Sequence, residues 1–123
     1  MKHLFTGKTI AAGAVVLGAI TLTSTDGCGA PLFLISVNGL ARAIRAITIS
    51  TDPIHQSVIS ACIAHPDMVT GAGRDTSVLM KSVPGLFAKD GAEAVEIGSL
   101  PDGRTYAIKF SDGSARAAGV VIP

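Results

Sequence analysis

The chain has 123 residues, of which 48% are hydrophobic and 15% charged, and its formal net charge at pH 7 is +1. This length supports one small domain, and the composition excludes a disordered polar linker. The sequence has no basic run, and four Phe and one Tyr are its only aromatic residues, so we predict no nucleic-acid partner. Two cysteines, Cys28 and Cys62, are too few for a disulfide framework. They leave open a single bridge in an exported protein, or free thiols or a metal ligand in a cytosolic one.

The first 23 residues form a distinct segment, in which basic residues between positions 2 and 8 precede an apolar run from Ile10 to Leu22. A basic region followed by a short apolar region is the outline of a secretory signal. The run is too short for a transmembrane helix, which needs about 20 apolar residues. A closely packed buried helix or strand stays open as the alternative. We therefore expect a signal-like segment over residues 1–23 and a domain over residues 24–123.

Residues 31–49 predict a strand followed by a helix. PLFLISV, residues 31–37, is a short apolar run after a Gly/Pro turn, which is typical of a buried strand. Asn38 is a candidate cap for a helix over residues 39–49. In that helix Leu40, Ile44 and Ile47 fall at helical spacing, with two arginines on another face.

Asp52 and Pro53 predict the start of a second helix, with the aspartate as N-cap and the proline at the first helical position. This helix should continue to His65, where the following proline stops it. Its apolar stripe is predicted to include Ile54, Val58 and Cys62.

The remainder of the chain predicts a glycine loop, a short helix and a meander. Gly71 and Gly73 lie in the loop, and Asp75 or Thr76 is the candidate cap of the helix. From residue 86 the apolar period changes from helical to two, and Pro101-Asp102-Gly103 is the clearest hairpin signal. The predicted fold class is α+β, with helices plus an antiparallel meander.

STDGCGAP, residues 24–31, places Cys28 between two glycines and two residues after Asp26. Flanking glycines strip bulk from around the thiol and let the backbone turn sharply. This pattern suits a sulfur that meets a metal or another partner. It equally suits an ordinary tight turn in which the aspartate forms an Asx turn.

Five stretches of the sequence resemble the asparaginase II family: STDGCGAPLF, GLARA, AHPDMVTGAGRD, LMKSVPGLFAKDGAE and LPDGRTYAIKFSDGSARA. The resemblance implies hydrolysis of the side-chain amide of L-asparagine to L-aspartate and ammonia. It also implies a fold similar to that of serine β-lactamases and glutaminases, here in part. By the family's motifs, Lys89 in AKDG is the active-site lysine and Cys28 is a zinc ligand. Asp26 either supports the zinc ligands from behind or binds the substrate amine.

The chain departs from the family in residues 1–23, which we expect to be unrelated to it, and at the nucleophile. The family uses a serine in a Ser-x-x-Lys step, and no serine of this chain has a lysine three residues on. The Cys-x-x-Lys that completes the family's zinc site is also absent. We therefore expect a fragment of a cytoplasmic L-asparaginase, inactive alone, that works with a missing N-terminal half or pairs as a homodimer. The alternative is a small exported or membrane-associated α+β module without catalysis, so the sequence leaves enzyme activity open.

Overall fold

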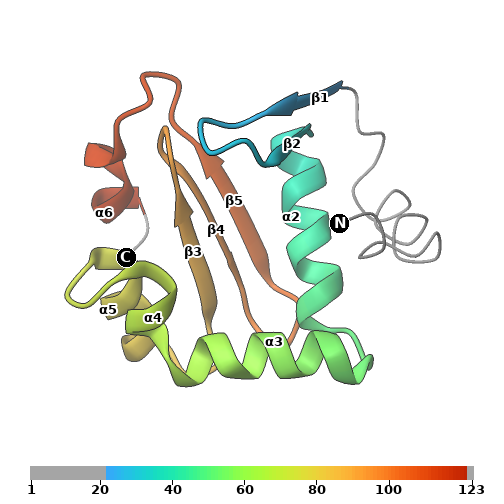
Figure 1. Ribbon diagram of the computed structural model, residues 1–123. Coiled ribbons are helices and arrows are strands. Elements are labelled where there is room, and N and C mark those ends of the chain that lie inside the picture. The colour runs from blue at the N-terminus through green and yellow to red at the C-terminus, as the bar shows by residue number, and fades with distance from the viewer. Residues whose placement is uncertain (1–21, 122–123) are drawn as a thin grey trace.

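A computed structural model describes residues 22–121 of the chain (Figure 1). The predicted signal-like segment lies outside these residues, apart from Leu22 and Thr23. The α+β class predicted from the sequence is confirmed. In chain order the elements are β1 (Leu22–Thr25), β2 (Pro31–Leu34), α2 (Val37–Thr48), α3 (Pro53–Ala64), α4 (Pro66–Thr70), α5 (Asp75–Ser82), β3 (Phe87–Gly91), β4 (Val95–Ser99), β5 (Thr105–Lys109), the 3₁₀ turn η1 (Ala115–Ala117) and α6 (Ala118–Val121).

The predicted meander is an antiparallel sheet in the order β3-β4-β5, and it lies at the centre of the molecule (Figure 1). In this sheet Asp90 lies opposite Glu96, and Gly98 lies opposite Tyr106. The turn between β4 and β5 contains Gly103 at a φ of 87°, a backbone conformation that favours glycine. Arg45 of α2 donates a hydrogen bond to the carbonyl of Gly103 at 3.1 Å and ties the helix to this turn.

Helices cover both faces of the sheet. Side chains alternate between the faces along each strand, so the neighbouring residues Phe87 and Ala88 enter different core clusters. On one face Phe87 packs with Ile44 of α2 and Ile59 of α3. On the other face Ala88 packs with Met80 of α5 and with Leu86. Figure 1 shows α2 on one side of the sheet, α4, α5 and α6 on the other, and α3 across its lower end.

The helix starts confirm one predicted cap and correct the others. Asp52 caps α3, accepting a hydrogen bond from the backbone N–H of Ile54 at 2.8 Å. The cap of α2 is Ser36 rather than Asn38, and its hydroxyl accepts from the backbone N–H of Gly39 at 3.0 Å. The helix can start two residues earlier because Ser36 supplies an oxygen to the free N–H groups of its first turn. At α5 the cap position is Arg74, without a side-chain cap bond, so the prediction of Asp75 or Thr76 as the cap is wrong.

Of the stripe predicted for α3, Cys62 packs against the core, whereas Ile54 and Val58 do not. Ile54 and Val58 are 73% and 54% exposed. The residues that pack into the core are Ile59, Cys62 and Ile63. The physical reason is the position of α3 across the end of the sheet, where only the second half of the helix meets Phe87.

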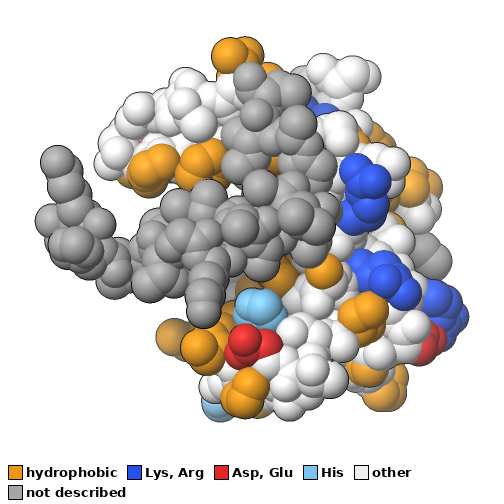
Figure 2. Space-filling model, turned by 90° about the vertical axis from the view of Figure 1, so that its right-hand side faces the viewer, with side chains coloured by type: hydrophobic (Ala, Val, Ile, Leu, Met, Phe, Trp, Pro, Cys, Tyr) orange, Lys and Arg blue, Asp and Glu red, His pale blue; other side chains and the backbone are white. Residues whose placement is uncertain are grey.

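β1 and β2 form a separate two-stranded antiparallel hairpin. The strand predicted over residues 31–37 is present only at Pro31–Leu34, because Val37 already begins α2. Its predicted burial is wrong, because every residue of both strands is exposed. Leu32, Phe33 and Leu34 are 43–51% exposed. Figure 2, which views the molecule from the α2 side, shows hydrophobic side chains at several separate points outside the grey region. Within residues 22–121, no helix has the length and apolar character required to cross a bilayer.

Candidate functional site

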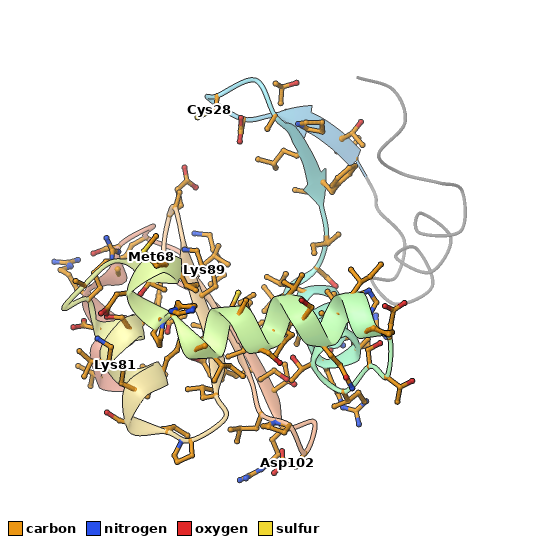
Figure 3. The ribbon with its side chains drawn as sticks, turned by 60° about the horizontal axis from the view of Figure 1, so that its bottom comes forward. Cys28, Met68, Lys81, Lys89 and Asp102 are labelled. Carbon is orange, nitrogen blue, oxygen red and sulfur yellow. The ribbon has the colours of Figure 1, made fainter. Side chains whose placement is uncertain are left out.

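Asp26 and Cys28 lie in the turn of the β1–β2 hairpin. The Asp26 carboxylate accepts hydrogen bonds through Oδ1 from the backbone N–H groups of Cys28 at 2.9 Å and Ala30 at 2.8 Å. Asp26 therefore organises the turn, as the Asx-turn interpretation requires. Its second oxygen, Oδ2, has no hydrogen-bond partner among residues 22–121. The Cys28 thiol is free and exposed at the tip of the hairpin (Figure 3).

The described residues do not supply a complete zinc site. Structural zinc is held by four ligands and catalytic zinc by three protein ligands. Across residues 22–121, no three His, Cys, Asp or Glu side chains are grouped so that they could hold a metal ion. Cys62, the second free thiol, lies on α3 and is half-buried against the hydrophobic core. Cys28 can thus act only as one ligand of a site that is completed from elsewhere.

Lys89 lies on β3, which is an edge strand of the sheet. Its ammonium group donates to Asp90, both to the backbone carbonyl and to Oδ1, the latter at 3.0 Å. No hydrogen bond or ion pair within the described part of the chain joins Lys89 to Asp26 or Cys28. In Figure 3 the cysteine and the lysine lie on separate elements, one on the hairpin and one on the sheet. The structure thus does not bring the three predicted site residues into contact.

A cavity of about 260 Å³ lies on the face of the sheet that carries Asp90 and Glu96. Its floor is this cross-strand pair of acidic residues, which the register places directly opposite each other. The residues that line it come from β3, β4, the start of α5 and the C-terminal helical turns: Arg74, Asp75, Thr76, Asp90, Glu96, Ala115 and Ala118. Like charges directly opposite each other in a sheet are destabilising, so this pair needs compensation from its surroundings.

Asp90 receives that compensation from two cations. Arg74 donates to its Oδ2 at 2.6 Å, and Lys89 reaches Oδ1 around the sheet edge. Burial acts to raise the pKa of Asp90, but the hydrogen bond and charge of Lys89 and the charge of Arg74 outweigh it and hold the pKa below its ordinary value. The two cations therefore favour the ionised form of Asp90.

Glu96 has no cationic partner among the described residues and is only 7% exposed. Its Oε1 accepts long hydrogen bonds from the Tyr106 hydroxyl at 3.4 Å and the Thr76 hydroxyl at 3.5 Å. Burial raises the pKa of Glu96, and the negative charges of Asp90 and Asp75 raise it further, against the lowering effect of the two hydrogen bonds. Burial and the neighbouring Glu96 raise the pKa of Tyr106 as well. A buried carboxyl that holds its proton more tightly than usual can exchange a proton with a ligand.

The chain matches a family model described as L-asparaginase II over residues 7–123. It belongs to the L-asparaginase II family. The family resemblance of the five sequence stretches is thereby confirmed. The match begins at residue 7, inside the segment that the sequence predicts to be signal-like. No curated protein matches this asparaginase II chain.

In the asparaginase II chain, the sequence indicates Asp75 and Thr76 only as candidate helix caps, and the structure places both in the wall of the cavity. Glu96 alternates with Val95 and Ile97, which predicts a solvated position on the second face of a half-buried strand. Gly98, two residues further along the strand, could have indicated that this face is covered, because an isolated glycine in a strand marks a close approach by another group. Here that group is Tyr106.

Proposed function

We propose that this chain carries part of an L-asparaginase, which hydrolyses L-asparagine to L-aspartate and ammonia, and that it does not catalyse this reaction unaided. The family match over residues 7–123 carries the proposal. The second half of the proposal rests on the absence of a Ser-x-x-Lys step from the 123 residues. Without an activated nucleophile, the remaining residues can bind and orient an amide but cannot form a covalent intermediate with it.

The proposed site residues are Lys89, Asp26 and Cys28, each with a separate role. The ammonium of Lys89 lies at a strand edge, where it can stabilise a developing oxyanion. Asp26 keeps Oδ2 unbonded within residues 22–121, so this oxygen can accept a charge-assisted hydrogen bond from the ammonium group of asparagine. The exposed Cys28 thiol is available to zinc as a single ligand.

Assembly of a complete site requires a second polypeptide segment, either a missing N-terminal half or a second copy of the chain. The exposed two-stranded hairpin supports this requirement, because an isolated hairpin is marginally stable in water and gains from further strands. A cytoplasmic location fits this function. The alternative of an exported, non-catalytic module depends on residues outside 22–121 and stays a prediction.

The test is ammonia release from L-asparagine by the purified chain, with and without added zinc. We expect no release above the uncatalysed rate. We expect release when the chain is mixed with a separately expressed N-terminal half of an asparaginase II protein that contains Ser-x-x-Lys. Lys89→Ala should abolish this complemented activity, whereas Lys109→Ala, which removes another exposed strand lysine, should retain it. Release by the chain alone would overturn the proposed dependence on a partner, and a mixture that stays inactive would overturn complementation.

A further inference from the structure

The β1–β2 hairpin has one face that carries three leucines. Directly opposite residues of an antiparallel pair lie on the same face, and successive residues of a strand alternate between faces. The register places Leu22 opposite Leu34 and Ser24 opposite Leu32, so these four side chains share a face. Leu22, Leu32 and Leu34 form this leucine face, and they are 43–66% exposed.

Nothing in the described part of the chain covers the leucine face. The two strands contact each other, and no other helix or strand among residues 22–121 packs extensively against either of them. Figure 3 shows the hairpin projecting away from the helices and the meander. A two-stranded hairpin is marginally stable in water, and grouped exposed apolar side chains are typical of a contact surface. The leucine face therefore requires an apolar, uncharged partner.

The residues directly before β1 have the composition of such a partner. From Ile10 to Thr21 the sequence has no charged side chain, and Thr21 carries the only hydrogen-bonding side chain. This segment is joined directly to Leu22, so its effective concentration at the leucine face is high. Gly18, four residues before the strand, offers a place where the chain can reverse its direction.

The segment is also long enough to cover the face. As a helix, a segment of this length spans about 18 Å, and as a strand it spans more. A strand as short as β1 or β2 is only about 13 Å long. Residues 10–21 can therefore lie along the whole hairpin in any regular conformation.

The family match supports a place for this segment inside the domain. The L-asparaginase II model matches residues 7–123, which include the whole apolar run. A secretory signal, by contrast, is removed from the mature protein and lies outside the folded domain. This argument uses family membership and does not depend on the proposed asparaginase chemistry.

We infer that residues 10–21 fold back onto the leucine face and are part of the folded domain. Removal of the three leucines and of the apolar run from water stabilises the covered hairpin. The leucine face is then occupied by its own chain and is not available to a second copy or to a membrane.

Methyl contacts in the full chain test this inference directly. With labelled leucine and valine methyl groups, we expect nuclear Overhauser effects between Leu32 or Leu34 and Val15 or Val16. A sample mixed from labelled and unlabelled chains separates contacts within a chain from contacts between chains. Absence of these effects, or their appearance only between chains, would overturn the inference. Removal of residues 10–21 from the expressed chain, seen in its intact mass, would overturn it as well.

Two variants provide an independent test. Val16→Asp puts a charge into the middle of the segment, and Thr6→Asp puts the same charge before the apolar run. Chymotrypsin cleavage after Phe33, followed by mass spectrometry, reports how often the hairpin opens. We expect cleavage about tenfold faster in Val16→Asp and unchanged in Thr6→Asp. Circular dichroism checks that both variants keep their helices and meander. Equal cleavage rates in the two variants would contradict the packing.

Discussion

Adding one methyl group at Gly98 tests how closely Tyr106 packs over the sheet. A Cβ atom built on Gly98 would lie 2.3 Å from Cε1 of Tyr106, 2.5 Å from Cζ and 2.7 Å from the hydroxyl oxygen. Separations below 3.0 Å are essentially never seen for real Cβ atoms, so the ring must move by about 1 Å. That movement would pull the hydroxyl away from Glu96, to which it already donates over a long 3.4 Å.

The cost of Gly98→Ala follows from three contributions. Overpacking costs about 1–3 kcal/mol, and the lost hydrogen bond about 1 kcal/mol. Replacing glycine returns about 0.4–1 kcal/mol by restricting the unfolded chain. We expect a net loss of about 2–3 kcal/mol of unfolding free energy, or roughly 10–20 °C in Tm for a domain of this size.

Urea unfolding followed by circular dichroism measures this loss, and Tyr106 fluorescence reports the displaced ring. Gly91→Ala is the matched control in the same sheet, because its Cβ would meet the nearest atoms of Val95 at 3.7 Å, an ordinary contact. The control should be unchanged or more stable by up to about 1 kcal/mol. A Gly98→Ala variant as stable as the unmodified chain, with unaltered Tyr106 fluorescence, would refute the close packing.

Two further predictions concern the β3–β4 turn and the buried carboxyl. Glu93 has a φ of 56°, a left-handed conformation that costs most residues about 1–2 kcal/mol. Glu93→Gly should therefore raise the unfolding free energy by about 0.5–1 kcal/mol, and Ala92→Gly should lower it by about 0.4–1 kcal/mol; chemical denaturation that ranks them the other way would contradict the strain. Because folding raises the pKa of Glu96 above its ordinary value of 4.5, the folded state binds the extra proton, and the stabilisation by Glu96 is complete below that value. It should disappear as the pH rises through the folded-state pKa. The difference in unfolding free energy between the unmodified chain and Glu96→Gln, measured across pH, should show this fall, and a flat difference would contradict it.

Elements determined by local chemistry were predictable from the sequence. Asp52 followed by Pro53 specifies a helix start through one side-chain bond and one fixed backbone angle, and α3 begins there. The meander followed from the alternation of side chains and from Pro101-Asp102-Gly103, since hairpin turns depend on a few residues.

Burial was less predictable, because it depends on what tertiary structure places above each face. Phe33 belongs to an apolar run typical of a core strand, yet it is 51% exposed because no further layer covers the hairpin among residues 22–121. Glu96 differs from its pattern in the opposite direction. Its alternation with apolar residues predicts a solvent-exposed side chain, whereas Thr76, Tyr106 and the C-terminal turns enclose it. The candidate cavity was not predictable from the sequence for this reason, since its lining residues come from three separate parts of the chain, 74–76, 90–96 and 115–118.

The exposed β1–β2 hairpin implies that the described part of the chain does not open as one cooperative unit. The strands pair with each other, and no helix or sheet packs extensively against them among the described residues. Such a segment opens with a free energy well below that of the core. Its amide protons should therefore exchange quickly while those of β4, the central strand of the other sheet, stay protected. A protease could cleave at the Cys28 turn and leave the helices and the meander folded.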